Sequence, residues 1–410
     1  MTPTLPVQHT VRRKTLFTVL TILLLYLFFE VLSLAALAAL GRFLNIRYTP
    51  IAAHYLSRTH KEGIRVILEN RSPHLTYSNL LGWTLKPNGA TAVAEINSQG
   101  VRSNHEFAMS PANGTIRIAA FGDSFTYAEG VKNKNTWEEQ LTQIDPSIET
   151  MNFGVPGYGL DQAFLRYKSE GGSFHPHIVL LGYFVENILR HINVFRPFYS
   201  TETGTPLTKP RFVLRGDELV LVNNPLTPLS AYQKLLSDPE TVLPRLGEYD
   251  YHYQTKYRAD DFDFIPSVRL FKMASYNIRK HVSPDPVFIG RRYNPKSEAF
   301  LVTAKLFDAF YAAALKNGSL PVIVIFPKES NVRDVQTRRF KLHAPLMDYF
   351  EKRGYRVIDL TDGFARYAEK GKPVEDLYDG HFSEEGNRVA AEAVYQYLRK
   401  NGLLSEKTTR

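Results

Sequence analysis

Ser124 lies in the sequence FGDSFT at residues 121–126, directly after the apolar run IRIAA at 116–120. A β-branched run that stops at a glycine and then presents an Asp-Ser pair is the pattern by which a strand places a nucleophile at the edge of a sheet. A serine hydroxyl becomes a useful nucleophile only when a nearby base removes its proton. His381, in the sequence DGHFS at 379–383, offers that base just before a predicted amphipathic helix. With a neighbouring acid, this pair could carry out acyl transfer through a covalent serine ester.

The acid that would orient the imidazole has two candidates. Asp379 lies two residues before His381, and Asp376 lies five residues before it. An acid in this role holds one ring nitrogen so that the other can face the serine. We expect Asp379 to take the role, and Asp376 stays open as the alternative.

Four short blocks, in chain order, resemble the motif blocks of the SGNH, or GDSL-type, serine hydrolases. They are GDSF at 122–125, NFGVPGYG at 152–159, LGYFVEN at 181–187 and DGH at 379–381. The resemblance covers about residues 115–190 and 295–400, and it implies an esterase. It also implies the donors that stabilise the oxyanion, which are the backbone N–H groups of Ser124 and Gly157 and the side-chain amide of Asn187. Loss of one such donor typically costs ~2.7–4 kcal/mol of transition-state stabilisation.

The sequence departs from this family pattern at two places. The family usually has its acid three residues before the histidine, whereas Tyr378 stands three residues before His381. The third block of the family tends to read Gly-x-Asn-Asp, whereas Glu186 precedes Asn187 here and Ile188 follows it. These departures bear on the identity of the acid and on the role of Asn187.

Two further residues near these blocks have expected roles. Gly154 is the alternative to Gly157 as an oxyanion donor, since a residue without a side chain lets a substrate approach the backbone closely. Asp123 is expected to be structural and to support the turn before Ser124 by hydrogen bonding.

The elements that must position these residues alternate along the chain. Short apolar runs alternating with helical patterns predict a parallel sheet that is covered on both faces. The expected class is therefore α/β, a flavodoxin-like three-layer α/β/α fold with a five-stranded parallel sheet. Ligands bind such sheets at the carboxyl ends of the strands, where all four blocks fall. The expected strands are 116–121, 149–153, 178–184, 321–326 and 355–360, and the expected helices are 136–144, 161–170, 298–316, 332–353 and 384–400.

The chain after residue 41 divides into a lead-in and a hydrolase domain that carries an insertion. Residues 42–114 read as a linker with short strands and turns, and residues 115–410 as the hydrolase domain. An insertion at about 190–295 interrupts the alternation, and its segment 211–222 predicts a β-hairpin that turns near Gly216. The insertion is rich in aromatic and acidic residues, so it could form a lid or a glycan-binding wall, or it could only pack locally.

Composition excludes several classes of function. The chain carries a net charge of +9 and no cysteine, so disulfides and thiolate metal sites are excluded. No basic-aromatic pattern indicates nucleic-acid binding. His175 and His177 could suggest a metal-ligand pair but lack nearby partners, and the glycines between 154 and 159 lack the residues of a nucleotide loop. We therefore expect no metal and no cofactor.

A long apolar run near the N-terminus predicts a transmembrane helix. Residues 15–40 are 26 residues with one charge, and at ~1.5 Å per residue they can cross a ~30 Å hydrocarbon layer. We expect a cytoplasmic segment 1–14, which carries basic residues, and a span over 15–41. Cleavage as a signal peptide after 36–38 stays open. Glu30 is the one charge in the run, and it either reaches water at the outer interface or binds a partner helix.

Together these patterns predict a single-pass protein of the cytoplasmic membrane with a periplasmic or extracellular serine esterase domain. The expected reaction is removal of O-acyl groups, acetyl above all, from an acylated envelope glycan. A first alternative is an O-acyltransferase component of polysaccharide acetylation that works with a membrane acyltransferase partner. A second is a non-catalytic scaffold with the same fold.

Overall fold

The computed structural model describes residues 7–282 and 286–405. The chain divides into two compact units, which we name the helix-pair unit (Met1–Ala53 and Thr255–Ser283) and the sheet unit (His54–Gln254 and Pro284–Arg410). Because the insertion expected at about 190–295 spans the boundaries at 254/255 and 283/284, it contributes to both units. The first six residues of the expected cytoplasmic segment 1–14 lie outside the described residues.

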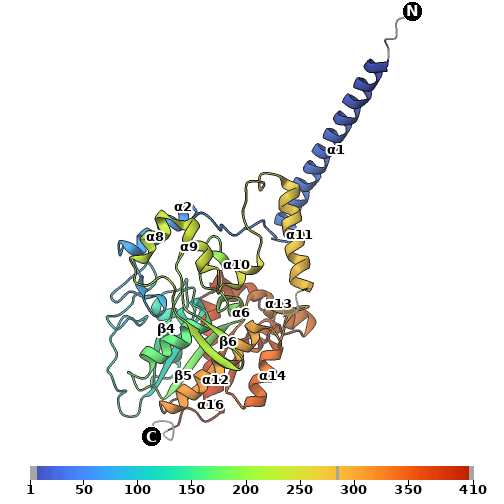
Figure 1. Ribbon diagram of the computed structural model, residues 1–410. Helices are drawn as coiled ribbons and strands as arrows, with labels where there is room; N and C mark the ends of the chain where they lie inside the picture. The colour runs from blue at the N-terminus through green and yellow to red at the C-terminus, as the bar shows by residue number, and fades with distance from the viewer. Residues whose placement is uncertain (1–6, 283–285, 406–410) are drawn as a thin grey trace, which may run out of the picture. The chain divides into compact units, whose positions relative to one another are not determined.

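A five-stranded parallel sheet forms the centre of the sheet unit (Figure 1). The strand order is β11-β10-β5-β3-β4, the flavodoxin-like order, and β3, β4 and β5 are buried along almost their whole length. This confirms the expected fold class. The strands are β3 (Ile116–Gly122), β4 (Ile148–Gly154), β5 (Ile178–Phe184), β10 (Leu320–Phe326) and β11 (Val357–Asp359).

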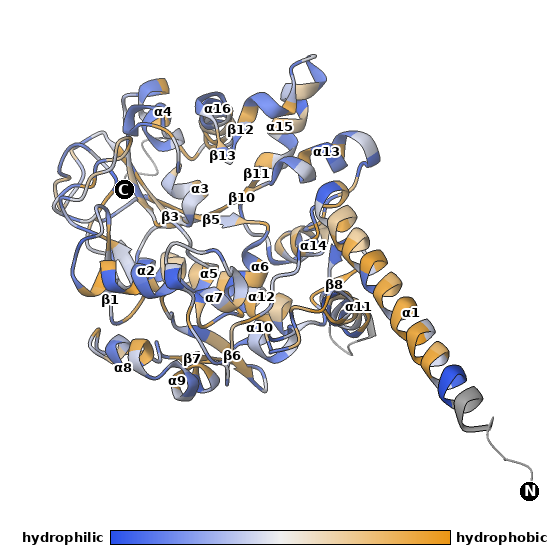
Figure 2. Ribbon diagram, turned by 90° about the horizontal axis from the view of Figure 1, so that it is seen from above, coloured by the Kyte–Doolittle hydropathy of each residue, from blue (hydrophilic) through white to orange (hydrophobic). Residues whose placement is uncertain are grey.

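Helices cover both faces of this sheet, as Figure 2 shows. One layer contains α4 (Trp137–Ile144), α15 (Leu360–Glu369) and α16 (Glu384–Lys400), and the other contains α5 (Leu160–Arg166), α12 (Glu298–Lys316) and α14 (Ala344–Arg353). The arrangement is the three-layer α/β/α sandwich that the alternation predicted.

The single helix expected over 332–353 is wrong. The structure has α13 (Glu329–Arg338) and then α14, and Arg339 between them adopts a left-handed conformation with φ of 49°. Pro345 stands in the first turn of α14, where its missing N–H costs nothing, but inside a continuous helix it would clash with the preceding turn. The apolar periodicity of the sequence continues through this proline, but the helical backbone is interrupted before it.

Shorter elements complete the sheet unit. The predicted hairpin is confirmed as β6 (Arg211–Arg215) and β7 (Glu218–Val222), with Gly216 at φ of 60° in its turn. The lead-in contributes α2 (Arg58–Leu68) and the hairpin of β1 (Leu75–Ser78) and β2 (Gly82–Leu85). The other elements are α3 (Ser124–Tyr127), α6 (Asn187–Arg190), α7 (Arg196–Tyr199), α8 (Ala231–Ser237), α9 (Pro239–Leu246), α10 (Tyr251–Thr255), β8 (Phe288–Ile289), β9 (Arg292–Tyr293), β12 (Tyr378–Asp379), β13 (His381–Phe382), 3-10 turns at Asn133–Asn135 and Val374–Leu377, and a π-turn at Tyr167–Gly171.

The helix-pair unit contains α1 (Val7–Phe43) and α11 (Pro266–Val282), which pack against each other. Within the described residues, Arg12–Phe43 is the one helix long and apolar enough to cross a membrane. A signal sequence passes the same test of length and composition.

Arg102 of the lead-in holds the chain that follows α3. Its guanidinium donates to the carbonyl oxygens of Tyr127, Ala128 and Val131, and its Nε donates to Asn133 Oδ1 at 3.0 Å. Only 4% of the residue is exposed, so these bonds are made away from water, where an unpaired partner would be costly. The lead-in is thus part of the support for the segment that follows Ser124.

Glu138 of α4 is a buried carboxyl group that should make stability depend on pH. It is 2% exposed, and neither carboxyl oxygen has a hydrogen-bond partner among the described residues. Burial raises the pKa of Glu138 well above its ordinary value, and the lowering effects of its own backbone N–H, of Arg102 and of Asn152 offset this only in part. A group whose folded pKa is raised stabilises the fold fully below its unfolded pKa, ~4.3, and loses that contribution as pH rises toward the folded value.

We therefore expect Glu138→Gln to stabilise the protein at pH 8 and to change little at pH 4. The gain should grow by ~1.4 kcal/mol per pH unit above ~4.3 until the folded pKa is reached. Urea denaturation at pH 4, 6 and 8 measures it. An equal effect of the substitution at all three pH values would contradict the assignment.

Candidate active site

Ser124 lies where β3 ends and is the first residue of the short helix α3. Asp123 caps this helix, because its Oδ1 accepts from the N–H of Phe125 at 2.9 Å. The backbone N–H of a first helical residue has no partner within its helix, so the N–H of Ser124 is left available. Ser124 is 3% exposed, so its hydroxyl sits in a largely dry environment.

His381 meets Ser124 although 257 positions separate them in sequence. The strands β12 and β13 form a tight hairpin around Gly380, whose φ is 70°, and this turn presents the imidazole at the carboxyl end of the sheet. His381 Nε2 lies 2.8 Å from Ser124 Oγ, and its ring packs on Phe125 with centroids 5.0 Å apart. The structure thus brings together the nucleophile and the base that the sequence predicted.

Neither candidate acid is hydrogen-bonded to the imidazole. In the part of the chain that the structure describes, Asp379 and Asp376 have exposed side chains and make no hydrogen bond to His381. Asp379 is the residue paired with His381 across the β12–β13 hairpin, so it is the nearer of the two along that ladder. The choice between them remains a prediction.

We expect Asp379→Asn to reduce ester turnover more than Asp376→Asn does. The residue that orients the imidazole also stabilises the imidazolium that forms, so its loss should lower kcat, by up to ~10⁴-fold where the acid is fully engaged. Turnover of p-nitrophenyl acetate by the two variants and by the wild type measures this. If Asp376→Asn is the more damaging variant, the acid is Asp376.

Glu129 is a neighbour that sequence reasoning missed. Its Oε2 lies 3.5 Å from His381 Nε2, the same nitrogen that faces Ser124, and the side chain is 47% exposed. An orienting acid must bond the other nitrogen, so Glu129 cannot take that role from this position. It follows α3, but nothing in its spacing indicated this contact.

The two glycines proposed as oxyanion donors differ in how their N–H groups are used. The N–H of Gly154 donates to Asn152 Oδ1 at 2.9 Å, and a Cβ on Gly154 would lie 2.1 Å from the backbone nitrogen of Tyr127. Gly154 is therefore needed for close packing. Gly157 adopts φ of 82°, and its N–H donates no hydrogen bond within the described residues. This difference favours Gly157 over Gly154 as a donor.

Asn187 lies at the start of α6 and is 1% exposed. Its Nδ2 donates to Asp123 Oδ2 at 3.0 Å, and Arg190 donates to the same oxygen at 3.3 Å. A side-chain amide nitrogen carries two hydrogens, so the bond to Asp123 uses one of them, and the oxyanion role expected of Asn187 stays a prediction. The same contacts fit the structural role expected of Asp123, whose two oxygens accept from three side-chain and backbone donors.

A cavity of about 410 Å³ adjoins two of the residues considered above, Gly157 and Glu129, and its lining does not include Ser124 or His381. Gly157 and Glu129 line it, together with His74 of the lead-in and Arg196 of the insertion. Arg196 donates to the carbonyl oxygen of Gly157 at 2.6 Å, and burial lowers the pKa of Arg196 to about 10. The lead-in and the insertion thus both border this cavity, and Arg196 holds the turn that carries the Gly157 N–H.

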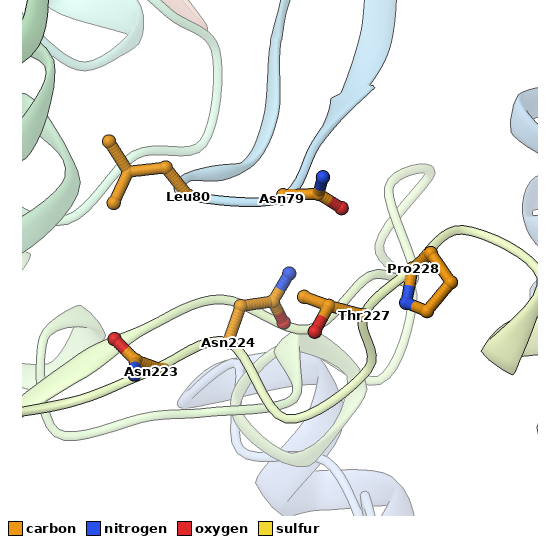
Figure 3. Close-up of a pocket in the computed structure, with 6 residues that line it drawn as sticks. All are labelled: Asn79, Leu80, Asn223, Asn224, Thr227 and Pro228. Carbon is orange, nitrogen blue, oxygen red and sulfur yellow. The ribbon is translucent and has the colours of Figure 1, made fainter.

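A second, more open pocket of about 520 Å³ lies between the β1–β2 turn and the segment after β7 (Figure 3). Its lining contains no titratable group. Asn223, Thr227 and Asn79 are exposed there, whereas Asn224 is 5% exposed and has an Nδ2 without a partner among the described residues. The full lining is Asn79, Leu80, Asn223, Asn224, Thr227 and Pro228. This pocket can bind neutral polar groups but cannot supply an acid or a base.

Within the described residues no group of three or more His, Asp or Glu side chains is placed to hold a metal ion. Of the pair His175 and His177, His177 makes a structural contact. Its Nδ1 accepts from the backbone N–H of Arg117 at 2.9 Å, at the start of β3.

No protein-family model matches the sequence, and a search of curated proteins finds no significant match. Solved structures with a likeness to the chain include a lipolytic protein of the G-D-S-L family from Desulfitobacterium hafniense (13% identity, TM-score 0.34, covering 69% of this chain and 100% of that one). Others are an acetyl xylan esterase (13%, 0.35, 68% and 98%) and an acylhydrolase from Bacteroides fragilis (12%, 0.34, 72% and 91%).

The observed sheet order, Ser124 at the end of β3 and His381 bonded to it give this chain the fold and the serine–histidine pair that its resemblance to the SGNH hydrolases predicted.

Proposed function

We propose that this protein is a membrane-anchored serine esterase that removes O-acyl groups, acetyl above all, from a glycan of the cell envelope. The observation that carries the proposal is the 2.8 Å contact between Ser124 Oγ and His381 Nε2. A scaffold without activity would have no need for a serine hydroxyl and an imidazole at hydrogen-bonding distance.

The proposed reaction has two steps. In the first, Ser124 Oγ attacks the ester carbonyl as His381 Nε2 takes its proton. The bond between the carbonyl carbon and the sugar oxygen then breaks, and the sugar leaves with that proton. In the second step water attacks the carbonyl carbon of the acyl-serine as His381 Nε2 takes its proton. The bond between that carbon and Ser124 Oγ then breaks, Oγ takes the proton back from His381, and the carboxylic acid leaves. The N–H groups of Ser124 and Gly157 and the amide of Asn187 would stabilise both oxyanions.

Acyl transfer to a second sugar would use the same acyl-serine and differ only in the group that attacks it. Mass spectrometry of the full-length protein in detergent, after exposure to an acetyl ester, should detect one added acetyl group on Ser124. If added glycan accelerates loss of that acetyl group and becomes acetylated, the protein is a transferase. If no acetyl group appears and no ester is turned over, the serine esterase proposal fails.

Two features support a glycan as the substrate. The insertion borders, through Arg196, the cavity that Gly157 and Glu129 line, and it forms most of the second pocket, whose amides and hydroxyl match sugar hydroxyl groups. Leu80 and Pro228 add apolar surface on which a sugar ring can rest. A polymer could reach both places at once, whereas a small ester could occupy only one.

We therefore expect Asn223→Ala to lower kcat/KM on an acetylated envelope polysaccharide about 10-fold and to leave p-nitrophenyl acetate turnover unchanged. Remote contacts supply binding energy only for substrates long enough to reach them. Leu315→Ala, at another exposed position, is the control. Equal loss on both substrates would indicate damage to the fold, and no loss on the polysaccharide would remove this pocket from the substrate path.

The anchoring and its direction are also part of the proposal. The basic residues Arg12, Arg13 and Lys14, at the N-terminal end of α1, favour a cytoplasmic N-terminus, which would place the sheet unit outside the membrane. A reporter fused after Arg410 that is active only in the cytoplasm would refute this orientation.

A further inference from the structure

The helix α11 exposes an apolar stripe. Phe264, Phe271 and Ile278 are 74%, 71% and 64% exposed, although side chains of this kind are usually buried. They recur every seven residues, which brings Phe271 and Ile278 to one face of α11 and places Phe264 just before its first turn. Phe262, which is 62% exposed, extends the same surface. We name these four residues the α11 stripe.

Glu30 of α1 fixes where α11 begins. Its Oε2 accepts from the backbone N–H of Ser267 at 2.9 Å, and its Oε1 accepts from the hydroxyl of Ser267 at 2.5 Å. A helix N-terminus presents unpaired N–H groups and a positive dipole end, so a carboxylate is favoured there. The charge within the apolar run therefore has its partner in the same chain, and Glu30 gives no separate reason to expect a helix from another protein.

The position of Glu30 along α1 sets a depth for α11. From Lys14 to Glu30 there are 16 residues, or ~24 Å at ~1.5 Å per residue. If the hydrocarbon layer of ~30 Å begins at Lys14, Glu30 lies ~6 Å inside its far boundary. Interfacial amphipathic helices bury their apolar face ~5–10 Å into that boundary. The first turn of α11, held at Glu30, is at the depth of such a helix.

Further bonds within the helix-pair unit set the orientation of α11. Lys272 bonds Asp260 at 2.7 Å and Asp263 at 2.6 Å, and Tyr48 donates to Asp263 at 2.6 Å. These contacts tie α11 both to the loop before it and to the chain that leaves α1. These polar side chains are used inside the unit, whereas the α11 stripe is exposed.

We propose that α11 is an interfacial helix that lies in the outer boundary of the bilayer beside α1, with the α11 stripe in contact with lipid. The inference rests on the membrane anchoring proposed above. Its occupant is the lipid surface itself, because the stripe is exposed and apolar, as the surface of α1 is, and α11 begins at the depth that Glu30 sets. Arg279, near the end of α11, is exposed and suits the phosphate groups of lipids. The inference also requires α1 to be retained, since cleavage near residue 38 would remove Glu30 from Ser267.

The absence of cysteine from the sequence allows a direct test. Single variants Phe271→Cys and Ile278→Cys of the full chain are labelled with a nitroxide and placed in nanodiscs of phosphatidylcholine and phosphatidylglycerol. Power saturation then compares access of oxygen, which concentrates in lipid, with access of a water-soluble nickel chelate. Leu24→Cys, in the middle of α1, serves as the lipid reference, and Leu315→Cys on the sheet unit as the aqueous one.

We expect both α11 labels to behave like Leu24, with oxygen access several-fold greater than nickel access. If Leu24 reports lipid while both α11 labels match Leu315, the inference is overturned and the anchoring stands. If Leu24 also reports water, the anchoring falls with it. Labels shielded from both reagents would mean that protein covers the stripe, which overturns the lipid assignment. Ester turnover, measured on the same samples, is expected to be unchanged, so it reports on the proposed activity separately.

Discussion

Replacing Ser124 by alanine is expected to lower p-nitrophenyl acetate turnover by about 10³-fold or more. The hydroxyl that would form the acyl-enzyme is lost, and water held by the remaining donors is a far poorer substitute. The change removes one oxygen atom from a side chain whose bond is to His381, so the fold should persist. Turnover, together with the urea midpoint of the variant, measures both effects.

His381→Gln provides the matched comparison. If the two residues act as one unit, the double variant should be no slower than the slower single variant, because losses within a catalytic unit are not additive. Turnover near that of the wild type in a folded Ser124→Ala protein would rule out Ser124 as the nucleophile. Losses that add fully would mean that the serine and the histidine act apart.

The central sheet could be predicted because its strands are near-continuous apolar runs of a length that suits strands and not helices. The expected run 178–184 matches β5, and 116–121 differs from β3 by one residue. The run 355–360 was too long, since β11 covers only Val357–Asp359 before α15 begins. There Asp359 accepts from the N–H of Thr361 as a helix cap, which a count of apolar residues does not register.

The site could be predicted only as far as backbone position decides it. Ser124 directly follows β3, and His381 lies in the β12–β13 hairpin just before α16, so the backbone of these elements brings the two residues together. Contacts that depend on side-chain direction or on the insertion could not be predicted from the sequence. Arg196 reaches the turn at Gly157 from the insertion, and Glu30 meets Ser267 across 237 positions. No local pattern encodes contacts of this kind, because they form only when distant segments pack.

A buried ion pair shows how strongly the insertion is tied to the sheet. Lys209 of the insertion donates to Asp161 in the first turn of α5, and their side chains are 3% and 0% exposed. Asp161 Oδ1 also accepts from the N–H of Gln162 at 2.9 Å. Helix α5 begins directly after the segment that carries Gly157, so this pair joins the insertion to the support of the proposed oxyanion donor.

Lys209→Met is therefore expected to lower the free energy of unfolding by ~3–5 kcal/mol, because it leaves the Asp161 carboxylate buried without its counter-charge. The double variant Asp161→Leu with Lys209→Met should recover most of that loss, since a well-packed apolar pair can replace a buried ion pair. Urea denaturation of the full chain in detergent measures both, with the fluorescence of Trp83 and Trp137 as the signal. These two are the tryptophans of the sequence, and both are buried in the sheet unit. A single variant as stable as the wild type would mean that Asp161 is held neutral or solvated in the fold, and the insertion would then be joined to α5 by packing alone.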